Sequence, residues 1–265
     1  MFEVDKIKSS EGKDLFSSNV YYLPEVDSTN KYAKSLRGES DFLVLTDYQT
    51  QGLGRMGRKW ESEKGKNLTF TLVKHFDIDP ANVQAVNYYF SYFLLACLKN
   101  FTVKMAAKDK TFPVFEIKWP NDILADSKKL SGFLIENDSS GKRFIIGAGL
   151  NVNQEKFPDE FADNTTCLKN IIGSEIDLNE LVIELLNVYS KNIKLILNKK
   201  YQIIYNLWKN SSGLIGKDIE FQSDEQMTKT GKIMDLLYNG GLKMQVNGEL
   251  KTYYSGDIKL ITENA

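Results

Sequence analysis

The hydrophobic residues of this chain follow two spacings, one typical of β-strands and the other of helices. From Val83 through Leu98 the apolar residues recur at helical spacing, which predicts a central helix with Cys97 facing the core. Alternating or short continuous apolar runs predict strands at residues 43–46, 68–72, 114–118, 132–136 and 144–148. The order of these elements along the chain predicts an α+β fold.

The pattern changes near residue 212. Before it, Asp177 with Glu180 three residues later marks the start of a helix that continues through Ile196, and a shorter helix ends at Trp208. After it, apolar and polar residues alternate, and Asn-Gly pairs typical of tight hairpins separate the strands. We therefore expect a large domain and a small β-barrel domain, at residues 1–212 and 213–265.

A long loop rich in glycine and cations lies between the first two predicted strands. Its residues 52–60 read Gly-Leu-Gly-Arg-Met-Gly-Arg-Lys-Trp. Glycines let backbone amides approach an anion closely, and arginines supply forked, permanently charged donors, so the segment is suited to phosphate. It is neither a Walker loop nor a dinucleotide fingerprint, because no helix follows it as those motifs require. On composition alone, a solvated surface loop explains it equally well.

Four other segments combine polar or small residues with the ends of predicted elements. Residues 27–30 (Asp-Ser-Thr-Asn) have the composition of a helix N-cap, and residues 118–122 (Lys-Trp-Pro-Asn-Asp) hold Asn and Asp at a Pro-fixed turn. Residues 128–132 place lysine before a core strand, and residues 147–153 place small residues at a strand end. Each also has an ordinary structural explanation: a cap, an Asx turn, a solvated lysine and close packing.

Composition argues against several classes of protein. A net charge of -1 offers no overall attraction to nucleic acid or anionic membranes. The two cysteines, Cys97 and Cys167, and the single His75 form neither a metal-ligand nor a disulfide framework. No run approaches the roughly 18 apolar residues of a membrane span, and the N-terminus lacks the apolar core of a signal peptide. We therefore expect a cytoplasmic protein.

Taken together and in order, these motifs resemble the biotin–protein ligase family of bacterial type, over about residues 20–262. The resemblance implies a mixed sheet packed with helices, as in class II aminoacyl-tRNA synthetases and biotin ligases, with a small C-terminal SH3-like β-barrel. It implies activation of biotin with ATP to biotinyl-5′-AMP and transfer to a lysine of a biotin carboxyl carrier protein. Mg²⁺ would be bound with ATP rather than by a dedicated protein cage, and the protein would be a monomer or homodimer.

The resemblance also implies roles for individual residues. Those implied for biotin are Ser28, Thr29, Asn30, Gln49, Gly52, Leu53, Gly54, Arg55, Lys129, Gly132 and Gly147. Those implied for ATP are Arg55, Arg58, Trp60, Lys118, Asn121 and Asn151. The implied catalytic residues are Arg55, Lys118, Asp122 and Lys129. The cations would offset the repulsion between two anionic substrates, and Asp122 would position the acceptor lysine or receive its proton.

Two features of this chain depart from relatives. Members of the resembled family commonly have arginine at the position of Leu53, so this loop has one fewer cation. Leu53 either weakens retention of the adenylate or caps the apolar face of biotin, and we expect faster adenylate loss than in a Leu53→Arg variant. Some relatives carry an N-terminal helix-turn-helix of several dozen residues. Here only about twenty residues precede the strand that ends at Leu23, so we do not expect DNA binding.

Three alternatives remain at this level. A lipoate ligase or octanoyl transferase shares the fold but usually has a histidine near the binding loop, and His75 lies outside it. A nucleic-acid-binding module explains a basic loop and a barrel, although the net charge weighs against it. A catalytically inactive scaffold is the third, which the cations Arg55, Arg58, Lys118 and Lys129 argue against.

Overall fold

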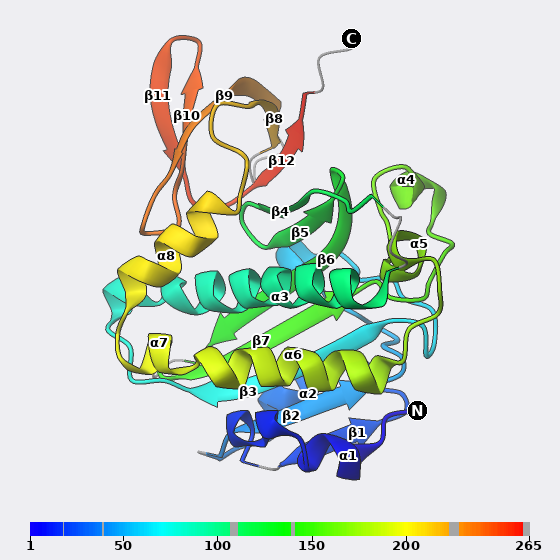
Figure 1. The fold of residues 1–265 in the computed structure, drawn as a ribbon. Helices are drawn as coiled ribbons and strands as arrows, with labels where there is room; N and C mark the ends of the chain where they lie inside the picture. The colour runs from blue at the N-terminus through cyan, green and yellow to red at the C-terminus, as the bar shows by residue number, and fades with distance from the viewer. Residues whose placement is uncertain (18, 39, 107–110, 139–140, 223–227, 262–265) are drawn as a thin grey trace.

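The body of the protein is a seven-stranded mixed sheet with strand order β1-β2-β3-β7-β6-β5-β4. The computed structural model describes residues 1–265 apart from 18, 39, 107–110, 139–140, 223–227 and 262–265 (Figure 1). The strands are β1 (Val20–Leu23), β2 (Phe42–Thr46), β3 (Leu68–His75), β4 (Phe115–Lys118), β5 (Asp122–Ala125), β6 (Lys128–Asn137) and β7 (Arg143–Leu150). β1 and β2 are parallel, and every other neighbouring pair is antiparallel.

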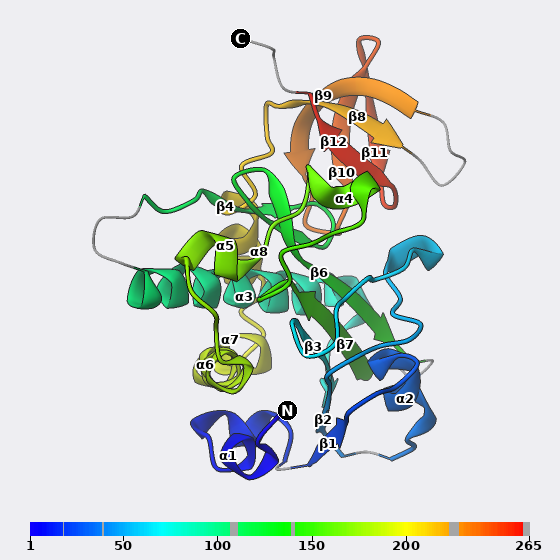
Figure 2. The same ribbon diagram turned by 90° about the vertical axis from the view of Figure 1, so that its right-hand side faces the viewer.

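Long helices cover one face of this sheet and leave the other for the site. Figure 2 shows α3 (Gln84–Met105) and α6 (Leu178–Asn192) on one side of the sheet and α2 (Thr29–Ser35) on the other. The Tyr189 hydroxyl of α6 donates to the Phe90 carbonyl of α3 at 3.0 Å, and both rings are fully buried. Cys97 is also fully buried in this layer, as predicted. The remaining helical segments are α1 (Val4–Lys8), η1 (Glu11–Leu15), η2 (Arg55–Gly57), η3 (Pro80–Asn82), α4 (Asp159–Ala162), α5 (Leu168–Ile172), α7 (Lys194–Leu197) and α8 (Tyr201–Asn210).

The C-terminal segment forms a separate five-stranded antiparallel sheet, in the order β11-β10-β9-β8-β12. Asn247 and Gly248 have φ of 51° and 83°, and they form the predicted hairpin turn between β10 and β11. In the described residues no pairing joins β11 to β12, so the sheet is open, and the predicted closed barrel is not observed. Its strands are β8 (Asp218–Gln222), β9 (Thr228–Leu236), β10 (Leu242–Val246), β11 (Glu249–Tyr253) and β12 (Asp257–Leu260).

Aromatic side chains hold the C-terminal sheet against the body. The indole nitrogen of Trp119 donates to the Gly240 carbonyl at 2.9 Å, and the Tyr205 hydroxyl donates to the Leu236 carbonyl at 2.7 Å. The ring centroids of Tyr88 and Trp208 lie 4.4 Å apart between α3 and α8. This packing brings β12 beside the glycine-rich loop, whose Arg58 forms an ion pair with Asp257 there.

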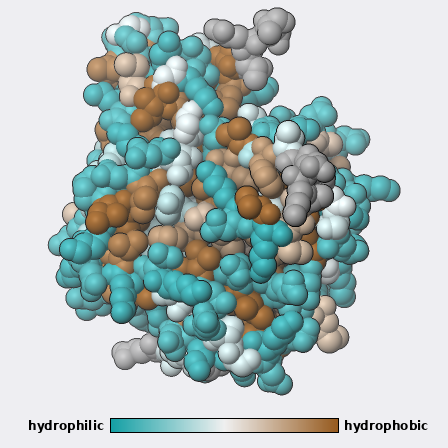
Figure 3. All heavy atoms as spheres, viewed as in Figure 1, coloured by the Kyte–Doolittle hydropathy of each residue, from teal (hydrophilic) through white to brown (hydrophobic). Residues whose placement is uncertain are grey.

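The outer faces of the helices are mostly polar. Figure 3, viewed from the side of α3 and α6, shows a largely hydrophilic surface on which hydrophobic residues form separate spots. None of the helices in the described part of the chain is long and apolar enough to cross a membrane.

The α+β class and all five predicted strand positions are confirmed, with corrections at the boundaries. β4 begins at Phe115, one residue later than expected, and Asp122, assigned to a turn, is the first residue of β5. The Asp177 side chain caps α6 by accepting from the Asn179 amide at 2.7 Å. The prediction that this helix continues through Ile196 was wrong. α6 ends at Asn192, and the short α7 follows after Ile193. The helix expected to end at Trp208 continues to Asn210.

Candidate active site

A pocket of about 490 Å³ lies between the large sheet and the start of α2. Its walls come from the start of α2, the loop between β2 and β3, the β4–β5 turn, the strands β6 and β7, and the segment around α4. It brings together Ser28, Thr29, Asn30, Gln49, Leu53, Gly54, Arg55, Arg58, Trp60, Lys118, Asn121, Asp122, Lys129, Gly132, Gly147 and Asn151. Segments that are ambiguous separately therefore surround one cavity.

Gly52 is a predicted binding residue that does not line the pocket. Its carbonyl accepts a hydrogen bond from the Trp60 amide at 2.9 Å. A Cβ built at Gly52 would lie 2.5 Å from the Trp60 carbonyl oxygen, which no side chain tolerates. Gly52 thus closes the loop on itself, and its role here is in the shape of the loop rather than in the lining.

Glycines form the floor of the pocket. Gly132 of β6 pairs with Gly149 of β7, so both positions face the same side of the sheet. A Cβ at Gly132 would lie 3.0 Å from Asp122 Oδ1, and a Cβ at Gly147 would lie 2.2 Å from Asn30 Oδ1. A Cβ at Gly149 would lie 2.3 Å from Cε2 of Trp60. Each missing side chain therefore makes room for a functional group that rests on the backbone of the sheet.

One end of the pocket is polar and buried. Gln49 Oε1 accepts from the Thr29 backbone amide at 2.8 Å and from the Thr29 hydroxyl at 3.0 Å. These donors fix the orientation of the Gln49 amide, because its oxygen must face them. In the described residues its Nε2 group has no protein acceptor, so it is available as a donor to a ligand.

Asn30 is held more completely by the protein. Its amide nitrogen donates to the Leu134 carbonyl and to Glu136 Oε2, each at 3.1 Å, and its Oδ1 accepts from the Thr71 hydroxyl at 2.6 Å. Both donor hydrogens of the amide are used. Asn30 therefore shapes the pocket wall. Ser28 acts as the predicted N-cap of α2, accepting from the Lys31 amide at 3.5 Å.

The other end of the pocket is cationic. Lys129 Nζ lies 2.8 Å from Asp122 Oδ1, and Arg58 pairs with Asp257. Burial lowers the pKa of Lys118 below its usual value. Asp122 opposes that shift in pKa, whereas the charges of Lys129 and Arg58 add to it. Lys118, Lys129 and Arg58 thus outnumber the two carboxylates that pair with them, Asp122 and Asp257, so this end is suited to an anionic ligand.

Trp60 links the loop to this cationic end. Its indole lies against the bare backbone of Gly149, and Lys129 Nζ lies 5.8 Å from the ring centroid. The indole Nε1 is buried and has no hydrogen-bond partner in the described residues. Because a buried donor without a partner is costly, this group is suited to a ligand acceptor or an ordered water.

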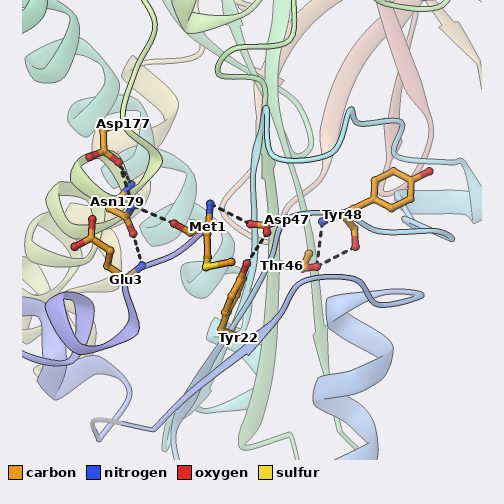
Figure 4. A network of polar contacts seen from close by, with 8 residues as sticks. All are labelled: Met1, Glu3, Tyr22, Thr46, Asp47, Tyr48, Asp177 and Asn179. Carbon is orange, nitrogen blue, oxygen red and sulfur yellow. Dashed lines mark hydrogen bonds and ion pairs between the residues drawn. The ribbon is translucent and has the colours of Figure 1, made fainter.

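The base of the glycine-rich loop is anchored to the sheet. The Asp47 carbonyl accepts from the Gly65 amide at 2.9 Å, which joins the two ends of the loop. The Asp47 carboxylate accepts from the Tyr22 hydroxyl and lies 3.9 Å from the Met1 ammonium (Figure 4). Burial, together with Asp47, raises the pKa of Tyr22 to about 12, so Tyr22 remains a donor at neutral pH. The loop therefore leaves and rejoins the sheet at fixed points.

Several residues of the lining were not predicted from the sequence. Phe157, Pro158 and Phe161 come from the segment around α4, and Asp257 comes from β12. Phe161 is a large apolar residue that is 45% exposed, and exposed apolar side chains of this kind are found at binding sites. The Phe157-Pro158 pair and Phe161 were visible in the sequence as an apolar segment with a proline. No residue near Asp257 in the sequence indicated that it pairs with Arg58.

The sequence of this chain is similar to those of known ligases. A bifunctional ligase/repressor BirA from Bacillus subtilis is 31% identical over 255 residues, covering 93% of this chain and 75% of that protein. The model of the biotin/lipoate A/B protein ligase family matches residues 22–153. The chain belongs to the biotin/lipoate A/B protein ligase family. The family match contains α2, the loop, the β4–β5 turn and the glycine floor, whereas the α4 segment and Asp257 lie beyond it.

Solved and curated ligases support the family assignment over most of the chain. A biotin protein ligase from Aquifex aeolicus, in complex with biotin and ATP, has a TM-score of 0.74 and 28% identity. The match covers 92% of this chain and 99% of that one. A biotin–[acetyl-CoA-carboxylase] ligase of Mycobacterium tuberculosis is 27% identical over 224 residues, which is 82% of this chain and 77% of that protein.

No group of three or more His, Cys, Asp or Glu residues that would hold a metal occurs within the described ranges. The acidic residues that line the pocket include Asp122 and Asp257, and each is paired with a cation.

Proposed function

We propose that this protein is a biotin–protein ligase, which activates biotin with ATP to biotinyl-5′-AMP and transfers the biotinyl group to a lysine of a carrier protein. The observation that carries the proposal is the division of one pocket into a buried polar end and a cationic end. Biotin has the same division, with a hydrogen-bonding ureido ring at one end and a carboxylate at the other. The family membership and the ligases of similar structure support it.

The polar end favours biotin over lipoate. A dithiolane ring would leave the Nε2 hydrogens of the oriented Gln49 amide without an acceptor, and unmet buried polar groups are costly. A ureido group offers both donors and an acceptor, so it satisfies them. We assign Ser28, Thr29, Gln49 and Gly132 to this ring. Asn30, Leu53, Gly54 and Gly147 complete the biotin-binding wall.

The cationic end performs the first half-reaction. The biotin carboxylate oxygen attacks the α-phosphorus of ATP, a phosphoanhydride bond breaks, and pyrophosphate leaves. Both reactants are anions, so Arg55, Arg58 and Lys129 offset their repulsion and stabilise the charge that builds on the phosphorus oxygens. Mg²⁺ bound with ATP would supply further positive charge beside the phosphates. Trp60, Lys118, Asn121 and Asn151 surround the nucleotide.

Asp122 serves the second half-reaction. The amine of the acceptor lysine attacks the acyl carbon of the adenylate, AMP departs, and the amine loses a proton as the amide forms. Asp122, the first residue of β5, lines the pocket and already pairs with the ammonium of Lys129 at 2.8 Å. A carboxylate placed in this way orients an incoming amine or accepts its proton. The acceptor is a biotin carboxyl carrier domain.

The two sheets correspond to two proposed domains, residues 1–212 for substrate binding and catalysis and residues 213–265 for a small SH3-like β domain. Asp257 supports a role for the second domain in the site, because it lines the pocket from the second sheet. The C-terminal domain thus contributes to the nucleotide end of the site.

Incubation with ATP, Mg²⁺, biotin and a biotin-carrier domain tests the proposal. We expect mass spectrometry to show one biotinyl adduct on the carrier, and ATP–pyrophosphate exchange to depend on biotin and not on lipoate. The absence of an adduct on a carrier that a control ligase modifies would overturn it. Exchange driven by lipoate would instead identify a lipoate ligase.

A further inference from the structure

We propose that Gly149 is a positioning residue for Trp60, and that the absence of a side chain at this position determines where the loop places its indole ring. The inference concerns the ATP end of the pocket and rests on the proposed function. Gly149 does not bind the substrates in this proposal. It acts only through the ring that lies on it.

The contact between the two residues is close and extends along one edge of the indole. A Cβ at Gly149 would lie 2.3 Å from Cε2, 2.5 Å from Cζ2 and 2.7 Å from Nε1 of Trp60. Carbon atoms in ordinary contact are about 3.5 to 4.0 Å apart, so even an alanine would displace the ring by about 1 Å or more. No other atom is nearer to this position than the indole.

The ring cannot avoid the collision by a simple shift of the loop. The Trp60 amide is bound to the Gly52 carbonyl at 2.9 Å, and the Trp60 carbonyl lies against Gly52. The backbone of Gly149 is equally fixed, because β7 pairs with β3 on one side and β6 on the other. The displacement therefore falls on the side-chain torsions of Trp60, which turn the ring into the pocket.

The position of the ring matters for its neighbours. Lys129 Nζ lies 5.8 Å from the indole centroid and 2.8 Å from Asp122 Oδ1, so the ring forms one wall of the space around this cation. A ring raised from the floor would occupy the volume proposed for the nucleotide. We therefore expect the binding of ATP to suffer more than the chemical step.

Steady-state ATP–pyrophosphate exchange tests this with four proteins: the wild type, Gly149→Ala, Trp60→Leu and the double variant. We expect Gly149→Ala to raise KM for ATP by about tenfold, the size of a lost base-stacking contact, with kcat within about twofold. Leucine lacks Nε1, Cε2 and Cζ2, so Gly149→Ala should have no further effect in the Trp60→Leu background. An unchanged KM, or an equal rise in both backgrounds, would overturn the proposal.

Gly147→Ala is the matched control, because it makes the same change two residues away on the same face of β7. Its Cβ would collide with Asn30 and not with Trp60. Its effect should therefore persist when Trp60 is replaced. Loss of that effect in the Trp60→Leu background would show that the coupling is not specific to Gly149, and would contradict the inference.

Tryptophan fluorescence provides a readout that does not depend on the proposed function. Trp119 and Trp208 are 2% and 1% exposed, so iodide quenching reports mainly on Trp60. We expect Gly149→Ala to increase quenching in the ligand-free protein and Gly147→Ala to leave it unchanged. Equal quenching in wild type and Gly149→Ala would overturn the inference. Failure of the wild type to exchange pyrophosphate with biotin would instead overturn the proposed function.

Discussion

Gly132 of β6 and Gly149 of β7 lie directly opposite each other in the large sheet, and the pocket exists because neither has a side chain. Side chains from two adjacent strands would otherwise fill the space above the backbone. Here the space is taken by the Lys129–Asp122 pair over Gly132 and by the Trp60 ring over Gly149. The depth of the pocket thus depends on the glycines of its floor as much as on the residues that surround it.

Gly147→Ala should weaken biotin binding by displacing Asn30. The new Cβ would lie 2.2 Å from Asn30 Oδ1, and overpacking of this kind costs about 1–3 kcal/mol. We expect a lower free energy of unfolding in urea and a higher KM for biotin. Asn30→Ala removes the collision, so the double variant should be no worse than Asn30→Ala alone. A further loss in the double variant would show that the floor, and not Asn30, is responsible.

Asp122→Asn should separate the two half-reactions. Asparagine keeps the shape of the side chain and a contact with Lys129 but cannot accept a proton, and such groups contribute about 10²–10⁴-fold. We expect near-normal ATP–pyrophosphate exchange and a single-turnover transfer to the carrier that is at least about 100-fold slower.

Glu116→Gln is the control for Asp122→Asn. Glu116 lies in the adjacent strand β4 and is likewise paired with a lysine, Lys217 at 3.3 Å, but it does not line the pocket. It should leave both half-reactions unchanged. Transfer at the wild-type rate in Asp122→Asn would remove Asp122 from the mechanism.

Lys118→Met should stabilise the protein at neutral pH and alter its pH dependence. Burial lowers the pKa of Lys118 in the folded state, whereas the unfolded chain keeps a value near 10.5. Between those two values the unfolded state binds more protons, so the contribution of Lys118 makes the free energy of unfolding rise with pH. Methionine has no such contribution.

Urea unfolding of wild type and Lys118→Met over a pH series measures this difference. We expect the variant to be the more stable at neutral pH, and its advantage to shrink as the pH approaches 10.5. The raised pKa values of Tyr22 and Cys97 affect both proteins alike and cancel in the difference. A stability difference that is constant with pH would contradict the assignment.

Leu53→Arg should slow the loss of the adenylate. Leu53 lines the pocket and is 38% exposed, so an arginine there reaches both solvent and the bound phosphate. We expect the isolated enzyme–adenylate complex of the variant to release biotinyl-5′-AMP several-fold more slowly than wild type. Equal release rates would show that Leu53 does not limit retention.

Met56→Arg separates position from charge. Met56 is 49% exposed, lies on the same loop and also lines the pocket. If retention depends on the position of the cation, Met56→Arg should slow release less than Leu53→Arg. An equal effect of the two substitutions would assign retention to the net charge of the loop.

Local features of the fold were predictable because they depend on neighbouring residues. The Asp177 cap and the Asn247-Gly248 turn follow from side-chain and backbone preferences over a few positions. The break after Asn192 was not predictable, because the apolar spacing continues past it through Ile196. There, tertiary packing overrides a pattern that is compatible with a longer helix.

The candidate site likewise has features that were predictable from neighbouring residues and features that were not. Its cations and glycines were identifiable because they cluster in short motifs, but what each glycine accommodates depends on distant partners. Gly147 makes room for Asn30, and Gly149 makes room for Trp60. Asp257 gave no local signal, since its relation to Arg58 exists only once two sheets have packed. The roles of these residues in binding and catalysis remain predictions.

The ion pair between Arg58 and Asp257 also has a consequence for the order in which the protein is made. The loop that carries Arg58 is synthesised early, whereas Asp257 belongs to the last strand of the second sheet. A nascent chain therefore contains the other residues that line the pocket before Asp257 has been translated. Only after translation has passed β12 is Arg58 held by its counter-ion, so completion of the site is tied to completion of the second sheet.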